Sequence, residues 1–125
     1  MTRYTPAETA LKSGFTMDTL RYYEKIGLLA DIDRTSGGRR AFTDDDLGWL
    51  GVLRCLRDTG MPIAQMCRYA ELARGGEQTL PDRLALLQDH ARGVEEQMQL
   101  LSNQYQHLLE KISGHRRALS PSVEV

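Results

Sequence analysis

The chain has 125 residues, 41% hydrophobic and 26% charged, with a net charge of −1. This suits one folded domain, or a small domain with a long helical extension, and is not typical of a disordered chain. No apolar run approaches the length of a membrane span, no signal peptide opens the chain, and two cysteines do not make a secreted disulfide framework, so we expect a cytoplasmic protein without membrane contact.

The charge is distributed unevenly. Residues 1–43 carry seven Lys/Arg against five Asp/Glu, a net +2, whereas residues 44–125 carry nine against twelve, a net −3. A near-neutral chain is a weak candidate for nucleic-acid binding, but a phosphate site needs only a local basic patch. The N-terminal third supplies that patch, and a second copy of the chain would double it.

The first expected helix begins in a capping box. Thr5–Glu8 has the capping pattern with proline at the first helical position, and Gly14 marks the end after about Ser13. The apolar spacing predicts that its inner face contains Ala7, Ala10 and Leu11.

A second short helix follows after a tight turn. Thr16 is its N-cap candidate, and Gly27 stands where a left-handed C-terminal cap would end it, which predicts a helix of about ten residues. Leu20 is expected to face inward, and Arg21 and Lys25 outward. Two short helices across a tight turn indicate a helix-turn-helix, although a generic helical hairpin fits this part alone.

A basic hairpin is expected at residues 34–42. Gly37 and Gly38 form a turn between two short arms that carry Arg34, Arg39 and Arg40. A helix followed by such a hairpin favours a winged helix-turn-helix, with the helix in the major groove of a duplex and the wing along the phosphates.

Residues 20–29, LRYYEKIGLL, resemble the LRYYE-x-IGLL signature of the MerR family of transcription regulators. The similarity runs from about Thr5 to Met66. The family's wing and the start of its next helix resemble Gly38, Arg40, Phe42 and residues 43–47. This resemblance implies a mainly α fold: a winged helix-turn-helix with a small β wing, two further helices and a long coiled-coil dimerisation helix. It implies a DNA-binding regulator and no enzyme.

The two further helices are expected to pack beneath the helix-turn-helix and support it. Thr43–Asp46 is a second capping box, and leucines follow at spacing three up to Gly60. Residues 61–63 start the next helix, whose inner face is expected to contain Ile63, Met66 and Ala70. Gly75 and Gly76 then interrupt the pattern.

The last third contains a heptad seam with alternating spacings of three and four. A narrow apolar stripe of this length cannot be buried in so small a domain, so a homodimer is expected; the family resemblance implies antiparallel pairing. The helix is expected to start near Pro81 and end at Gly114. The predicted parts are a DNA-binding domain at 1–76, a dimerisation helix at 77–114 and a flexible tail at 115–125. The seam consists of Leu84, Leu87, Ala91, Val94, Met98, Leu101, Tyr105, Leu108 and Ile112.

A two-fold dimer reads a palindrome, and each of its two DNA-binding domains should contact the duplex through its second helix and wing. Arg21 is the first candidate for base edges or nearby phosphates, and Tyr23 is ambiguous because it neighbours Tyr22 on a helix. Arg39 stands where the family usually has an aromatic residue. The candidate DNA contacts are Thr16, Thr19, Arg21, Tyr22, Tyr23, Lys25, Arg34, Arg39 and Arg40.

The resemblance also implies a mechanism and partners. MerR regulators bind double-stranded promoter DNA whose spacer is too long, and on activation they bend and untwist it so that the RNA polymerase holoenzyme engages both recognition elements. An effector then needs only to shift an equilibrium between two dimer shapes.

The effector is the open question. Metal-sensing members of the resembled family carry a cysteine pair beyond the dimerisation helix, whereas no cysteine follows Cys67 here and the histidines form no ligand cluster, so no metal and no cofactor are expected. Drug-sensing members carry a large C-terminal ligand domain, which is not expected here. The segment around Cys55 resembles the single-cysteine, thiol- and aldehyde-sensing (NmlR/AdhR-like) branch, in which that cysteine responds to electrophiles. Arg54 and Arg57 would favour a thiolate. One alternative is a MerR-like regulator or an architectural DNA binder with a different effector and a structural Cys55. The other is a coiled-coil interaction module that does not bind DNA.

Overall fold

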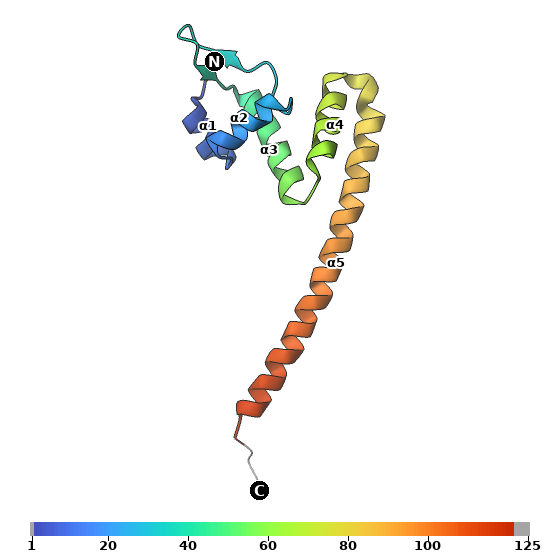
Figure 1. The fold of residues 1–125 in the computed structure, drawn as a ribbon. Coiled ribbons are helices and arrows are strands. Elements are labelled where there is room, and N and C mark those ends of the chain that lie inside the picture. The colour runs from blue at the N-terminus through green and yellow to red at the C-terminus, as the bar shows by residue number, and fades with distance from the viewer. Residues whose placement is uncertain (1, 122–125) are drawn as a thin grey trace. The chain divides into compact units, whose positions relative to one another are not determined.

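The computed structural model describes residues 2–121. It is mainly helical with one two-stranded antiparallel sheet, which confirms the expected fold class (Figure 1). The chain divides into two compact units, the first reaching Leu87 and the second beginning at Gln88. The elements are α1 (Pro6–Ser13), α2 (Met17–Lys25), β1 (Asp33–Arg34), β2 (Arg40–Ala41), α3 (Asp44–Asp58), α4 (Ile63–Arg74), the 3₁₀ turn η1 (Glu77–Thr79) and α5 (Leu80–Leu119).

The helix starts follow the capping signals. The Thr5 side chain accepts from the Glu8 amide, and a second capping box joins Thr43 to Asp46. Thr16 caps α2 by accepting from the Thr19 amide. These contacts satisfy amide groups that the first helical turn leaves free. The three predicted starts are therefore confirmed.

Left-handed glycines follow the two short helices. Gly14 has a φ of 78° at the end of α1, and Gly27 has a φ of 89° just beyond α2. Residues with a Cβ rarely adopt this conformation, so both helices stop where the sequence placed their ends.

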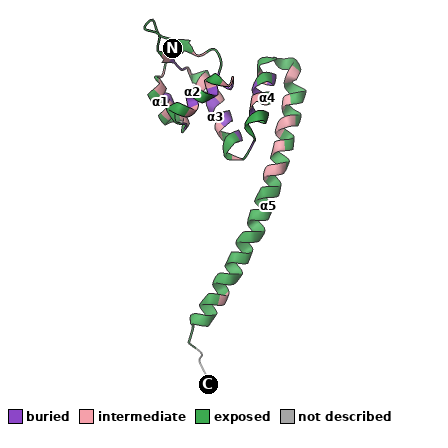
Figure 2. Cartoon of the chain, viewed as in Figure 1, coloured by how far each residue is buried: buried purple, intermediate pink, exposed green. Residues whose placement is uncertain are grey.

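The first unit is built around α3. Leu50 and Leu53 are fully buried, and Leu56 is nearly so, as their spacing of three predicts. Figure 2 shows buried positions along α3, whereas most of α5 is exposed. Residues from α2, the wing and α4 complete this core, and Leu86 and Leu87 from the first turns of α5 pack against it. The compact unit therefore extends beyond the predicted boundary at residue 76.

Two predicted inner faces need correction. In α1, Thr9 is fully buried and Ala10 packs on the core, whereas Ala7 is exposed and Leu11 is 87% exposed. In α4, Met66 and Ala70 are buried as expected, but Ile63 at the first position is exposed. A helix of two turns carries too few residues to define an apolar stripe, and a terminal residue lies beyond the packed surface.

The wing is a minimal hairpin. Asp33 pairs with Ala41 and Arg34 with Arg40, and the turn closes through the Gly38 amide, which donates to the Thr35 carbonyl at 2.9 Å. Phe42 is 2% exposed and pairs through its backbone with Tyr4, which attaches the hairpin to the N-terminal segment.

Helix α5 has 40 residues and continues past Gly114 to Leu119, so the predicted end at Gly114 is wrong. One glycine inside a long helix costs only about 1 kcal/mol, and Arg116 and Arg117 in the last turn interact favourably with the helix dipole. The predicted tail is thus helical up to Leu119, and its last four residues, 122–125, lie outside the described part. No helix within residues 2–121 is long and apolar enough to cross a membrane.

Candidate nucleic-acid interface

The outer face of α2 carries polar and basic side chains. Leu20 and Tyr23 are buried in the core, while Arg21, Tyr22 and Lys25 are exposed. Neighbouring helical residues point about 100° apart, so one tyrosine faces solvent and the other faces inward. Tyr22 is 50% exposed and Tyr23 only 3%.

Tyr23 therefore leaves the set of candidate DNA contacts. Its ring meets Phe15 edge to face, with centroids 5.2 Å apart, and burial raises the pKa of its hydroxyl. Phe15 lies in the turn of the helix-turn-helix, so Tyr23 fixes α2 against that turn. The role of Tyr23, which the sequence left ambiguous, is therefore core packing.

The remaining α2 candidates lie at or near its exposed side. Arg21 pairs with Asp18, and both side chains are more than half exposed, so this pair is weak and can open toward a phosphate. Thr16 is engaged in capping: its hydroxyl accepts from the Thr19 amide at 3.1 Å and donates to the Thr19 hydroxyl at 2.9 Å. Thr19 is only partly exposed.

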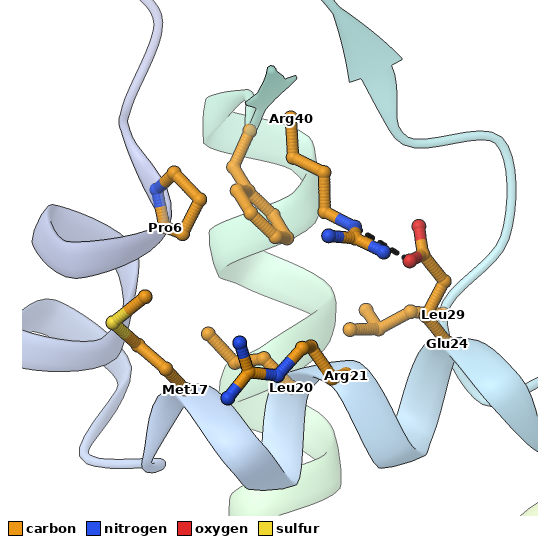
Figure 3. Close-up of a pocket in the computed structure, with 8 residues that line it drawn as sticks. Pro6, Met17, Leu20, Arg21, Glu24, Leu29 and Arg40 are labelled. Atoms are coloured by element: carbon orange, nitrogen blue, oxygen red, sulfur yellow. Dashed lines mark hydrogen bonds and ion pairs between the residues drawn. The ribbon is translucent and has the colours of Figure 1, made fainter. Parts of the chain in front are cut away.

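The three wing arginines differ in their surroundings. Arg34 donates to the Gly38 carbonyl at 3.0 Å within the hairpin, and Arg39 is exposed. Arg40 points to α2, where its Nε donates to Glu24 Oε1 at 2.6 Å (Figure 3). Two wing cations therefore remain at the exposed hairpin, and the third is held by an anion.

Cys55 is exposed on α3, and Cys67 is partly buried against the core. The two arginines near Cys55 have partners that the sequence did not indicate. Arg54 donates to Asp58 at 2.6 Å, and Arg57 donates to the same carboxylate at 3.2 Å. The hydrogen bond from Arg54 is the main cause that lowers the pKa of Asp58.

The same arginines brace the helix-turn-helix. Arg54 Nη1 donates to the Ser13 carbonyl at 3.2 Å, beside Gly14, and the Arg57 guanidinium lies 4.6 Å from the centre of the Phe15 ring. The turn of α3 that carries Cys55 is thus joined directly to the turn between α1 and α2. A side chain far along the sequence thus caps α1, and a Cβ at position 14 would overlap with Arg54 Nη1, so glycine leaves room for the guanidinium in this position.

Comparison with known proteins agrees with this geometry. Residues 4–72, more than half of the chain, match the MerR HTH family of regulatory proteins. The chain belongs to the MerR family. An uncharacterized HTH-type transcriptional regulator of Haemophilus influenzae is 40% identical over 92% of this chain and 85% of its own length.

Two further similarities are informative. The HTH-type transcriptional regulator AdhR of Bacillus subtilis is 34% identical to this chain. The match covers 66% of this chain and 59% of AdhR. The crystal structure of HiNmlR, a MerR family regulator lacking the sensor domain and bound to promoter DNA, superimposes with a TM-score of 0.85 at 38% identity, covering 94% of this chain and 93% of that one.

These similarities confirm the MerR resemblance and its NmlR/AdhR-like branch, and they place the chain among DNA-binding transcription regulators and not among enzymes. Within residues 2–121, no group of three His, Cys, Asp or Glu side chains is placed to hold a metal ion.

Proposed function

We propose that this MerR-family chain acts as a homodimer that binds a palindromic promoter spacer, distorts it and responds to a reactive electrophile at Cys55. The observation that carries the DNA-binding part is the exposed face of α2 beside the wing. Candidate contacts on this surface, Tyr23 now excluded, are Thr19, Arg21, Tyr22, Lys25, Arg34 and Arg39. Thr16 and Arg40 support it by capping α2 and by pairing with Glu24.

The exposed seam of α5 supports the homodimer. Met98, Leu101, Tyr105 and Leu108 lie together on one face of the second unit, and each is more than half exposed. Apolar surface of this extent in water is unfavourable, and a second copy of the same helix removes it. A two-fold dimer then presents two copies of the DNA-binding surface to the two halves of a palindrome.

Distortion of the spacer, with recruitment of RNA polymerase, is the mode of action that the family relationship favours. Bending and untwisting a short duplex costs a few kcal/mol, which phosphate contacts from two basic wings offset. An effector that binds or modifies one dimer shape more readily shifts the balance between the two shapes.

The exposure of Cys55 supports the electrophile response. An aldehyde carbonyl can add the thiol across its C=O bond, the sulfur bonding to carbon and the proton passing to oxygen, without an oxidant. The adduct would form on the α3 turn that Arg54 and Arg57 tie to the helix-turn-helix. A purely structural Cys55 would be expected inside the core, where free cysteines usually lie.

The test compares promoter activation by the wild type, Cys55→Ser and Cys67→Ser, each with and without formaldehyde, with DNA binding measured in parallel. We expect Cys55→Ser to bind DNA normally and to lose the response, and Cys67→Ser to respond as the wild type does. An equal response in all three proteins refutes electrophile sensing at Cys55 and leaves the DNA-binding proposal standing.

A further inference from the structure

Little in the hairpin itself fixes the angle between the wing and α2. Each wing strand has two residues, and an isolated two-stranded hairpin is marginally stable in water. Between the wing and α2 the structure leaves a cavity of about 60 Å³, lined by Met17, Leu20 and Phe42 among others (Figure 3). Phe42 and Leu20 pack into the same core, but their side chains leave this space beside the outer part of the wing unfilled.

One ion pair spans the junction. Glu24 lies in the last turn of α2 and Arg40 opens β2, and Nε and Oε1 are 2.6 Å apart. It is the one ion pair between α2 and the wing in the part of the chain that the structure describes. The two side chains are 32% and 26% exposed, so water screens them less than the exposed Arg21–Asp18 pair.

The charge of Glu24 does not favour DNA binding. A carboxylate beside a surface that binds phosphates repels them, and here it also neutralises one of three wing cations. On electrostatic grounds alone the chain would bind DNA more tightly without it. Its position against Arg40 gives Glu24 a different use, which is to hold the wing at a fixed angle to α2.

We propose that Glu24 is a positioning residue for DNA binding. Through its ion pair with Arg40 it holds the wing so that Arg34 and Arg39 meet the phosphate backbone while α2 occupies the groove. Arg40 therefore acts through the placement of the wing and not as a free phosphate clamp. This inference rests on the proposed function, because it requires α2 and the wing to bind one duplex together.

The sign of one mutational effect separates positioning from charge. Glu24→Gln keeps the side-chain shape, removes a negative charge and weakens the hydrogen bond to Arg40. Positioning predicts that the Kd for DNA rises about tenfold, since a charge-assisted hydrogen bond is lost. Asp18→Asn is the matched control: it removes an equal charge from a pair within α2, and its affinity should be unchanged or higher. A Glu24→Gln protein that binds as tightly as the wild type, or more tightly, overturns the inference.

The probe is a duplex selected by the wild-type chain from a randomised pool. The charge swap, Glu24→Arg with Arg40→Glu, should bind more tightly than either of its single substitutions because it restores the pair. Thermal unfolding of every variant serves as the folding check. A swap that binds no better than the singles, with unfolding unchanged, contradicts the inference.

A second readout needs no DNA. The Thr35 and Gly38 amides donate to carbonyls within the hairpin, and their hydrogen exchange should be faster in Glu24→Gln than in Asp18→Asn. If the wild type selects no duplex, the proposed function fails, and hydrogen exchange still decides whether Glu24 holds the wing. Equal exchange in the two variants would show that it does not.

Discussion

The two units of the chain differ in how far their apolar side chains are buried. In the first unit, three of the leucines of α3 are buried, with Leu50 and Leu53 fully inaccessible. In the second unit, Met98 and Leu101 are 66% and 67% exposed. The first unit buries its own core, whereas the second leaves an apolar face exposed, as the proposed homodimer requires. The first should therefore fold on its own contacts, and the second should need another copy of the chain.

Replacement of Leu101 by aspartate should dissociate the homodimer, and this is the largest effect that we expect. Leu101 lies in the middle of the exposed apolar face of α5, and a dimer would bury two carboxylates there without partners. We expect the dimer dissociation constant to rise by at least about 100-fold. Sedimentation of the purified protein measures it directly.

Gln99→Glu provides the control, since it adds the same charge two residues away, off the seam, on an exposed side chain. It should leave the dimer intact. Equal dissociation of both variants, or of neither, would contradict the seam assignment and with it the contrast between the two units.

Within the first unit the contrast can be tested between two leucines. Leu53→Ala should lower the free energy of unfolding by about 3 kcal/mol, because it leaves a cavity in a closed core. Leu11→Ala removes the same atoms from an 87% exposed position and should change stability by less than about 0.5 kcal/mol. Urea unfolding of both variants measures these changes in the free energy of unfolding. A similar loss of stability in both would mean that Leu11 is buried in the folded protein.

Local signals in the sequence were sufficient where structure is set locally. The hydroxyls of Thr5, Thr16 and Thr43 lie within one turn of the amides that they cap, so spacing alone predicted three helix starts. Gly14 and Gly27 marked helix ends for the same reason, since a left-handed conformation depends on the residue itself.

Features that depend on distant residues were missed. Leu11 and Ile63 were assigned to inner faces because each belongs to an apolar pattern, but the packing partner decides which face is covered. Glu24 received no role, since its partner lies 16 residues away and on another element. Arg54 was expected to favour a thiolate at Cys55, whereas its guanidinium donates to the Ser13 carbonyl at the end of α1.

A first unit that is complete by itself should carry the DNA contacts without affecting the dimer. Arg21→Ala should weaken binding to the selected duplex by about 10- to 100-fold, the range for losing a base or charged phosphate contact. It should leave sedimentation unchanged, the reverse of Leu101→Asp. Arg68→Ala removes an exposed arginine in a similar i,i+3 pair on α4 and should bind normally. Near-normal affinity of Arg21→Ala would refute α2 as the reading helix.

The smallest expected effect concerns the brace at the end of α3 and depends on pH. The pKa of Asp58 is lowered in the folded protein, chiefly by the hydrogen bond from Arg54, so the carboxylate stabilises the fold above the ordinary Asp value of about 3.9. This contribution is lost as pH falls through the lowered folded pKa. Asp58→Asn should therefore melt below the wild type at neutral pH, and the two melting temperatures should converge as the pH falls through the lowered folded pKa of Asp58. Glu95→Gln, an exposed carboxylate on α5, should match the wild type throughout. A difference for Asp58→Asn that persists unchanged at low pH would mean that the side chain stabilises the turn through its shape and not through its charge.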